Sequence, residues 1–237
     1  MTWSLLARDS DGCFGVAIAS RFFAVGALCV YTQRGVAALS TQALMNPLFG
    51  PLGLRLLQIG MSADQVLYEM LRTDEGREHR QVHMLPAKGS PIAYTGTSCV
   101  DWCGHVVGEN FSIAGNMLAG PQVLEETAHS YEAAAHLPLA QRLIHSMQAG
   151  ERAGGDKRGK QSAALKIQAD EDYLQLDLRV DDHAEPLSEL QRLYDKSLER
   201  FQPFVACLPG RHSAAGITDR NLIEEQIERF HATRVAA

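Results

Sequence analysis

A basic surplus, a long apolar run and an even cysteine count are all missing from this sequence. Lys and Arg number 22 against 28 Asp and Glu, so the formal net charge is −6. Phosphate binding needs clustered basic side chains, so this balance excludes nucleic acid as a partner. No stretch of about 20 apolar residues occurs, so we expect no membrane partner. The apolar pair Leu5-Leu6 is soon followed by Arg8-Asp9, which also argues against a signal peptide.

The cysteines limit both the compartment and the cofactor chemistry. Five cysteines in a chain of 237 residues are an odd count, which argues against a disulfide framework and for a reducing cytoplasm. Cys99 and Cys103, with His105 nearby, are spaced too loosely for a zinc signature. We therefore predict a cytoplasmic protein with no metal and no cofactor.

The first third of the chain is predicted to form strands and then helices. Apolar segments at 2–8 and 13–19 flank an Asp-Gly turn and predict a hairpin, with further strands at 27–32 and 35–41. A helix over 52–59 is expected to end at Gly60. The spacing of Ser62 and Gln65 then predicts a capping box at the start of the next helix.

The remaining segments complete an α+β pattern. Residues 79–114 are expected to form strands and turns, and 162–168 and 173–180 two later strands. The predicted helices cover 121–135, 138–149 (closed by Gly150), a segment after Pro186 and 221–230. Two antiparallel sheets between helix layers, a four-layer αββα sandwich, fit this order better than a doubly wound parallel sheet.

Thr2 leads a first strand at the N-terminus, an Asp-Gly turn follows, and an apolar strand ends in Ala19-Ser20-Arg21. These 21 residues resemble the start of proteasome-type N-terminal-nucleophile (Ntn) hydrolases. Six blocks follow in order: SRFFAVG (20–26), TQ (41–42), GREHRQ (76–81), GNMLAG (115–120), GGDKRGKQSAA (154–164) and LRVDDH (178–183). Together they resemble a bacterial and archaeal domain-of-unknown-function family, "ten twenty-eight", which is grouped with the Ntn hydrolases.

This resemblance implies an Ntn-hydrolase-like αββα domain over residues 1–205 and amidohydrolase chemistry. The segment 206–237 is predicted to be a C-terminal tail, with a short helix that docks at the interface of a homo-oligomer. The substrate class would be a small amide, a ureido compound or a short peptide.

Thr2 is the candidate nucleophile. An N-terminal Thr carries nucleophile and base together, because its Oγ attacks a carbonyl while its own α-amine accepts the proton. The α-amine has a pKa of roughly 7.7–8.0, close to working pH. The mechanism requires removal of Met1, since an acylated nitrogen is not a base.

Other polar residues are candidates for the same site. Ser20 is predicted to orient the Thr2 amine, and Arg21 to anchor a substrate carboxylate; the alternatives are a turn-capping Ser and a solvated Arg. Asn116 is a candidate oxyanion-hole donor or a turn residue. Thr41 and Gln42, which follow a predicted strand, are candidate substrate-binding residues.

The stretch 36–44 contains no lysine, although proteasome-like enzymes have one there that lowers the pKa of the nucleophile. Another cation, Arg21 or Arg158, would have to replace it. In the glycine-rich loop 154–159, Arg158 can clamp a substrate anion, or Asp156 and Arg158 can buttress each other. Gln161 is a candidate lining residue of the same site.

A last polar cluster follows the strand at 173–180. Asp181 is a candidate for binding substrate or pairing with Arg179, and His183 for binding substrate or capping the helix after Pro186. A separate acid–base site at Asp181, Asp182 and His183 stays open as a third hypothesis. The main alternative to an amidohydrolase is a non-catalytic ligand-binding or scaffold protein that keeps the Ntn fold.

Overall fold

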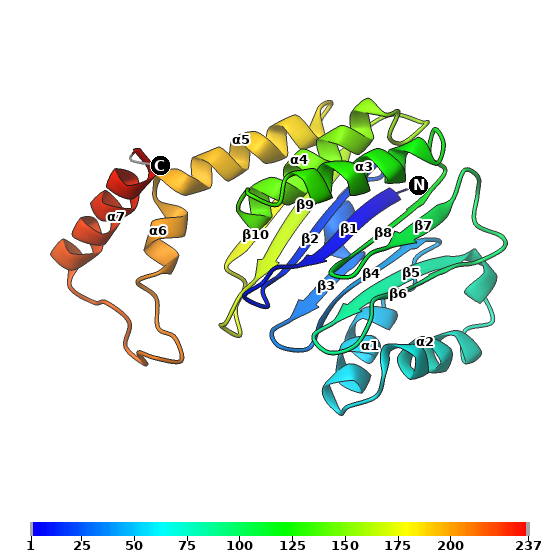
Figure 1. Ribbon diagram of the computed structural model, residues 1–237, viewed down its shortest axis with the longest axis horizontal. Coiled ribbons are helices and arrows are strands. Elements are labelled where there is room, and N and C mark those ends of the chain that lie inside the picture. The colour runs from blue at the N-terminus through cyan, green and yellow to red at the C-terminus, as the bar shows by residue number, and fades with distance from the viewer. Residues whose placement is uncertain (1, 236–237) are drawn as a thin grey trace. The chain divides into compact units, whose positions relative to one another are not determined.

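The structure, a computed structural model, describes residues 2–235. The chain forms two compact units, Met1–Leu190 and Gln191–Ala237. The first unit is mixed α/β, and its strands form two antiparallel sheets, as predicted. One sheet has six strands in the order β10-β9-β2-β1-β8-β7, and the other has four in the order β3-β4-β5-β6 (Figure 1).

The strands of the six-stranded sheet are β1 (Thr2–Arg8), β2 (Phe14–Ser20), β7 (Gly104–Val107), β8 (Phe111–Asn116), β9 (Ser162–Gln168) and β10 (Leu176–Val180). Those of the other sheet are β3 (Val30–Gln33), β4 (Ala37–Ala43), β5 (Arg80–Pro86) and β6 (Ile92–Thr95). The α-helices are α1 (Phe49–Gln58), α2 (Ala63–Arg72), α3 (Gln122–Ala133), α4 (Leu139–Arg152), α5 (Pro186–Glu199), α6 (Phe201–Val205) and α7 (Arg220–Val235). Short 3₁₀ helices lie at Val25–Ala27 and Arg77–His79.

β1 lies inside the six-stranded sheet, between β2 and β8. The predicted β1–β2 hairpin is present, and the Asp9 carboxylate caps its turn by accepting hydrogen bonds from the backbone amides of Asp11 and Cys13. Gly12 adopts a φ of 83°, the left-handed conformation that glycine tolerates. Both β1 and β2 are almost wholly buried, in keeping with their apolar sequences.

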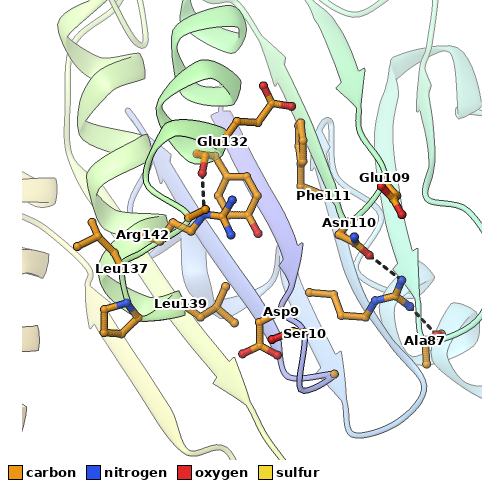
Figure 2. Close-up of a pocket in the computed structure, with 15 residues that line it drawn as sticks. Asp9, Ser10, Ala87, Glu109, Asn110, Phe111, Glu132, Leu137, Leu139 and Arg142 are labelled. Carbon is orange, nitrogen blue, oxygen red and sulfur yellow. Dashed lines mark hydrogen bonds between the residues drawn. The ribbon is translucent and has the colours of Figure 1, made fainter.

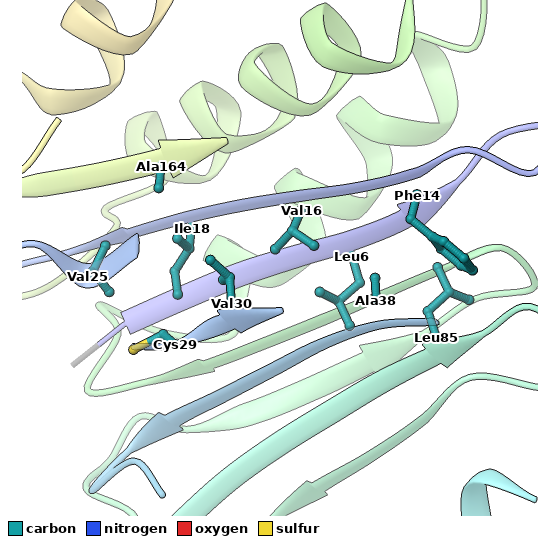
Figure 3. Close-up of a cluster of buried hydrophobic side chains, with 10 residues drawn as sticks. All are labelled: Leu6, Phe14, Val16, Ile18, Val25, Cys29, Val30, Ala38, Leu85 and Ala164. Carbon is teal, nitrogen blue, oxygen red and sulfur yellow. The ribbon is translucent and has the colours of Figure 1, made fainter. Parts of the chain in front are cut away.

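Side chains alternate across β1 and divide its two faces. Leu6 packs with Phe14, Val16 and Ile18 of the same sheet and with Ala38 and Leu85 of the other sheet, so a core lies between the sheets (Figure 3). On the opposite face, α3 and α4 cover the six-stranded sheet (Figure 1). The approach of α4 is close, since a Cβ at Gly15 would lie 2.4 Å from the Leu143 side chain. α1 and α2 pack on the four-stranded sheet.

The observed helix ends can be compared directly with the capping and stop residues predicted from the sequence. The capping box of Ser62 and Gln65 is present, with both reciprocal hydrogen bonds. Gly60 follows α1 with a φ of 96°, as expected of a residue that ends a helix. The predicted stop at Gly150 is wrong, because α4 continues to Arg152. This glycine serves packing instead, since a Cβ there would lie 2.2 Å from the Thr127 Oγ1 atom on α3.

The second unit contains the end of α5, then α6 and α7. Arg200 and Glu224 form an ion pair with contacts of 2.5 and 2.9 Å. Helix α7 is longer than the predicted 221–230 segment. Among the described residues, no helix is both long and apolar enough to cross a membrane.

Candidate active site

Thr2 begins β1, in the interior of the six-stranded sheet. It pairs with Asn116 of β8 and is 5% exposed. Its Oγ1 atom lies 3.1 Å from the Oγ atom of Ser20, at the end of β2. The hairpin register explains this contact, because Trp3 pairs with Ala19. The structure therefore brings together the two hydroxyl groups that the sequence indicated.

The carbonyl oxygen of Thr2 is held by two side-chain amides. Gln42 Nε2 and Asn116 Nδ2 each donate to it over 3.3 Å. Both amides also donate to the Oε1 atom of Gln81, over 2.8 and 3.1 Å. Gln81 in turn donates through Nε2 to Thr95 and to the carbonyls of Gly104 and Gly115. All three amides are buried and have their orientations fixed by partners on both sheets.

His83 extends this polar layer between the sheets. Its Nδ1 atom lies 2.9 Å from Ser112 Oγ and its Nε2 atom 2.8 Å from Ser4 Oγ. The Ser4 hydroxyl donates to Gln42 Oε1 over 2.7 Å, so Nε2 carries the ring proton that Ser4 accepts, and Nδ1 accepts from Ser112. Complete burial, with a smaller effect of His105, lowers the pKa of His83 to about 3. The ring is therefore neutral, and the layer around Thr2 carries no charge from it.

Asp156 joins the loop after β2 to the glycine-rich loop. Its buried carboxylate accepts from the backbone amides of Arg21 and Arg158, both over 2.8 Å. The Arg158 guanidinium donates to the Arg21 carbonyl over 3.1 Å and lies 3.4 Å from the same carboxylate. This is the buttress geometry, which was one of the two alternatives for the pair.

The side chains of Arg21 and Arg158 do not take the position of the missing lysine beside Thr2. The Arg21 side chain is exposed and donates to the Lys160 carbonyl over 2.8 Å. Among the described residues, neither Arg21 nor Arg158 makes a hydrogen bond or ion pair with Thr2. Each guanidinium lies at the rim formed by the two loops.

A small cavity of about 170 Å³ adjoins Ser20. Trp3 and the glycine-rich loop form much of its wall, and Lys160 adds a cation that is paired with Glu151 and Glu185. The hydrogen bond to Glu185 raises the pKa of Lys160, so this ammonium is charged. The lining residues are Trp3, Ala19, Ser20, Glu151, Gly154, Gly155, Asp156, Gly159, Lys160 and Pro186.

Gln161 lies beside the end of β2, away from the amide layer. Its backbone amide donates to the Ser20 carbonyl, and its side chain donates to Asp182 over 3.1 Å. The backbone amide of His183 donates to the Gln161 carbonyl. These contacts place Gln161 one hydrogen bond from Ser20.

Asp181 and His183 are engaged locally. Asp181 accepts a bidentate pair of hydrogen bonds from Arg179, which was one of its two predicted alternatives. His183 Nδ1 accepts from the backbone amide of Glu185 just before α5.

Thr41 is separated from its neighbour Gln42 by strand alternation. Its Oγ1 atom accepts from the backbone amide of Asn46, whereas Gln42 faces the six-stranded sheet. The structure does not bring Thr41 into the polar layer.

A family model for a family of unknown function, DUF1028, matches residues 2–190. The chain belongs to the DUF1028 family. The crystal structure of protein SPO2555 from Silicibacter pomeroyi, another DUF1028 protein, is 26% identical and superposes with a TM-score of 0.85, over 92% of this chain and 96% of that one. The ancestral β-subunit Anbu from Yersinia bercovieri is 13% identical, with a TM-score of 0.41 over 83% of this chain and 94% of that one. No curated protein matches the chain significantly.

The family match agrees with the resemblance that the six sequence blocks carried. Because DUF1028 is a family of unknown function, membership does not identify a reaction. The chemistry has to be inferred from the residues of the site. Within residues 2–235, no group of three or more His, Cys, Asp or Glu side chains is arranged to hold a metal ion.

Sequence reasoning missed the polar layer as a unit. Its members that were not singled out as site residues are Ser4, Ser40, Gln81, His83 and Ser112, all fully buried. A signal was present, because polar residues occur at alternate positions of several strands, such as 2 and 4 or 81 and 83. Such alternation normally indicates a solvent-facing side, and only the pairing of the two sheets shows that this side is interior.

Proposed function

We propose that this DUF1028 protein is an Ntn-type amidohydrolase, with Thr2 as nucleophile and its own α-amine as base after removal of Met1. The observation that carries the proposal is the 3.1 Å contact of Thr2 Oγ1 with Ser20 Oγ at the end of a buried central strand. Met1 itself lies outside the described residues. The proposal includes the four-layer αββα sandwich of the Ntn hydrolases, over residues 1–205.

Each neighbour of Thr2 has a role in the proposed reaction. The freed amine takes the Oγ proton, directly or through water, as Oγ attacks the carbonyl of a small amide, ureido or peptide bond. Ser20 orients this nucleophile and its amine through the hydroxyl contact. Asn116 and Gln42 fix the Thr2 carbonyl. Because the Asn116 side-chain amide is already used by the Thr2 carbonyl and by Gln81, the oxyanion hole is assigned to a backbone amide near Asn116.

Substrate binding is assigned to the rim near Ser20. Arg21 and Arg158 carry positive charge there and favour a substrate with an anionic group. Asp156 holds both residues in place through their backbone amides. In this proposal Gln161 lines the rim, whereas Thr41, Asp181 and His183 support neighbouring loops.

A covalent labelling experiment tests the nucleophile. An electrophilic amide-hydrolase inhibitor is expected to add to wild-type protein and to Thr2→Ser, but not to Thr2→Ala, with Ser10→Ala as a hydroxyl control on the β1–β2 turn. Equal labelling of wild type and Thr2→Ala would reject Thr2 as the nucleophile.

A non-catalytic ligand-binding role is the second candidate. The neutral surroundings of Thr2 favour it, because its described polar side-chain contacts are with Ser20, Gln42 and Asn116, and none of these is a cation. A catalytic Thr2 requires the amine to serve as base without a lysine. Absence of labelling together with retained small-molecule binding would favour this candidate.

Assembly and location complete the proposal. We assign the protein to the cytoplasm and infer a homo-oligomer in which the segment 206–237 contributes to a subunit interface. Light scattering on the full chain and on a chain ending at residue 205 tests this. A monomer for the full chain would contradict the assembly.

A further inference from the structure

A second and larger hollow lies at the opposite end of β1 from Thr2. Its volume is about 950 Å³, and it is lined by the β1–β2 turn, the β7–β8 turn and the connection between α3 and α4 (Figure 2). Small-molecule sites span roughly 300–1,000 Å³. β1 runs from Thr2 to Arg8, so at about 3.3 Å per residue the two sites are ~20 Å apart.

Arg8 is fixed at one side of this hollow by neutral acceptors. Its Nη1 atom donates to the carbonyls of Pro86 and Ala87, and its Nη2 atom donates to Asn110 Oδ1 over 2.9 Å. A long side chain that is tied at three points loses little further freedom when it binds a ligand. The guanidinium is thus held in place, and no carboxylate among residues 2–235 forms an ion pair with it.

Arg142 is fixed at another side by α3. Its guanidinium carbon lies 3.6 Å from the centroid of the Tyr131 ring, and its Nε atom donates to the Tyr131 carbonyl over 2.6 Å. Its terminal nitrogens make no other hydrogen bond with the described residues. A stacked guanidinium presents these nitrogens as a planar fork, the arrangement that binds a carboxylate bidentately.

Carboxylates line the same hollow without pairing with these arginines. They belong to Asp9, Glu109 and Glu132. Asp9 is committed to the hairpin turn, whereas Glu109 and Glu132 are exposed and form no hydrogen bond or ion pair with other described residues. Because the arginines are tied to neutral groups, opposite charges face the hollow separately. Such a lining is complementary to a ligand that itself carries both charges.

We propose that this hollow binds a zwitterionic small molecule of short-peptide size, with the ligand carboxylate on Arg142 and Arg8 and its ammonium group beside Glu109 and Glu132. Leu137 and Leu139, which are half-buried, supply apolar surface for the ligand's side chains, whereas the buried rings of Phe111 and Tyr131 support the wall behind them. The inference is independent of the nucleophile at the other end of β1.

Isothermal titration with the dipeptide L-alanyl-L-alanine tests the ligand class. We expect saturable binding with one site per chain. N-acetylation or C-terminal amidation removes one charge, and each is expected to weaken binding about fivefold. Acetate is the control for a simple anion site. No saturable dipeptide binding, or acetate binding as tight as that of the dipeptide, overturns the proposal.

Variants test the position of the site. Arg142→Gln is expected to weaken dipeptide binding about tenfold, whereas Arg55→Gln, an exposed arginine on α1, leaves it unchanged. The double variant Glu109→Gln/Glu132→Gln removes only exposed carboxylates. It is expected to weaken binding of the free dipeptide about threefold and to leave binding of the N-acetyl dipeptide unchanged. Unchanged dipeptide affinity in either the Arg142 or the double variant overturns the proposal. Thr2→Ala is expected to bind the dipeptide like wild type, so the proposed nucleophile and the proposed ligand site are tested independently.

Discussion

The two ends of β1 place polar groups in opposite electrostatic settings. At the Thr2 end, hydroxyls and amides from both sheets are buried and bond to one another, and the histidine among them is neutral. At the Arg8 end, charged side chains of both signs face an open hollow and do not pair across it. One strand therefore ends in an interior neutral network and in an accessible charged lining.

Burial explains the difference. A buried polar group without a partner costs about 1–3 kcal/mol, and a buried unpaired charge costs far more. The buried layer of hydroxyls and amides around Thr2 can therefore be polar only because it is neutral and internally hydrogen bonded, and the charged groups near it, such as Asp156 and Arg158, pair with each other in the loops. Solvent at the Arg8 end removes this restriction and allows charges to stay available for a ligand. Substitutions should accordingly affect stability at the first end and binding at the second.

The largest effect is expected at the center of the buried network. His83→Ala deprives Ser4 and Ser112 of their partner and leaves a cavity, so we expect the free energy of unfolding to fall by about 3 kcal/mol. Urea denaturation monitored by circular dichroism measures it. A loss below about 1 kcal/mol would mean that the hydroxyls find other partners, and the contrast between the ends would be weaker.

The pH dependence of stability gives the next largest effect. The folded-state pKa of His83, about 3, lies below its ordinary value of 6.5. As pH falls below 6.5, the unfolded chain takes up the proton first, so stability is full above that pH and is lost toward pH 3. The free energy of unfolding then falls by up to ~1.4 kcal/mol per pH unit, which amounts to about 2 kcal/mol between pH 6.5 and 5.

His83→Gln is the matched control for this pH effect. Other groups also destabilise the fold in acid, such as Asp74, whose pKa is lowered to about 2 by its hydrogen bond with Arg80. The difference between wild type and His83→Gln isolates the histidine. Parallel curves for the two proteins between pH 7 and 5 would contradict a neutral buried His83.

A smaller loss is expected for Arg142→Gln. This change removes the stacking on Tyr131 and the hydrogen bond to its carbonyl, both at a half-buried site, so we expect about 1 kcal/mol. Thermal unfolding measures it alongside the loss of dipeptide binding. A loss as large as that of His83→Ala would show that the Arg8 end is built for stability as well.

The smallest effect is expected for Glu132→Gln. The side chain is exposed and makes no described hydrogen bond, so the melting temperature should move by less than about 2 °C. Differential scanning calorimetry checks this. A larger shift would reveal a structural role for the carboxylates of the hollow.

Local sequence signals predicted most of the fold. The hairpin at Asp9–Gly12, the capping box at Ser62 and the two antiparallel sheets all follow from turn chemistry and periodicity. Gly150 failed as a helix stop because its role is close packing against α3, which no local pattern reveals. The contact of Thr2 with Ser20 was predictable from the register of a single hairpin.

The rest of the candidate site depends on pairing between distant strands. Gln42, Gln81 and Asn116 come from β4, β5 and β8, and only the facing of the two sheets joins their amides. The hollow at Arg8 likewise combines turns that are more than 100 residues apart in sequence. Composition and spacing identified several of these residues as candidates but could not show which of them are in contact.

The decisive measurement is mass spectrometry of the N-terminus of native, purified protein. If Thr2 is the nucleophile, the chain begins at Thr2 and carries the electrophilic inhibitor on that residue. A soluble, folded protein that keeps Met1 would contradict it, because an acylated Thr2 nitrogen cannot act as the base.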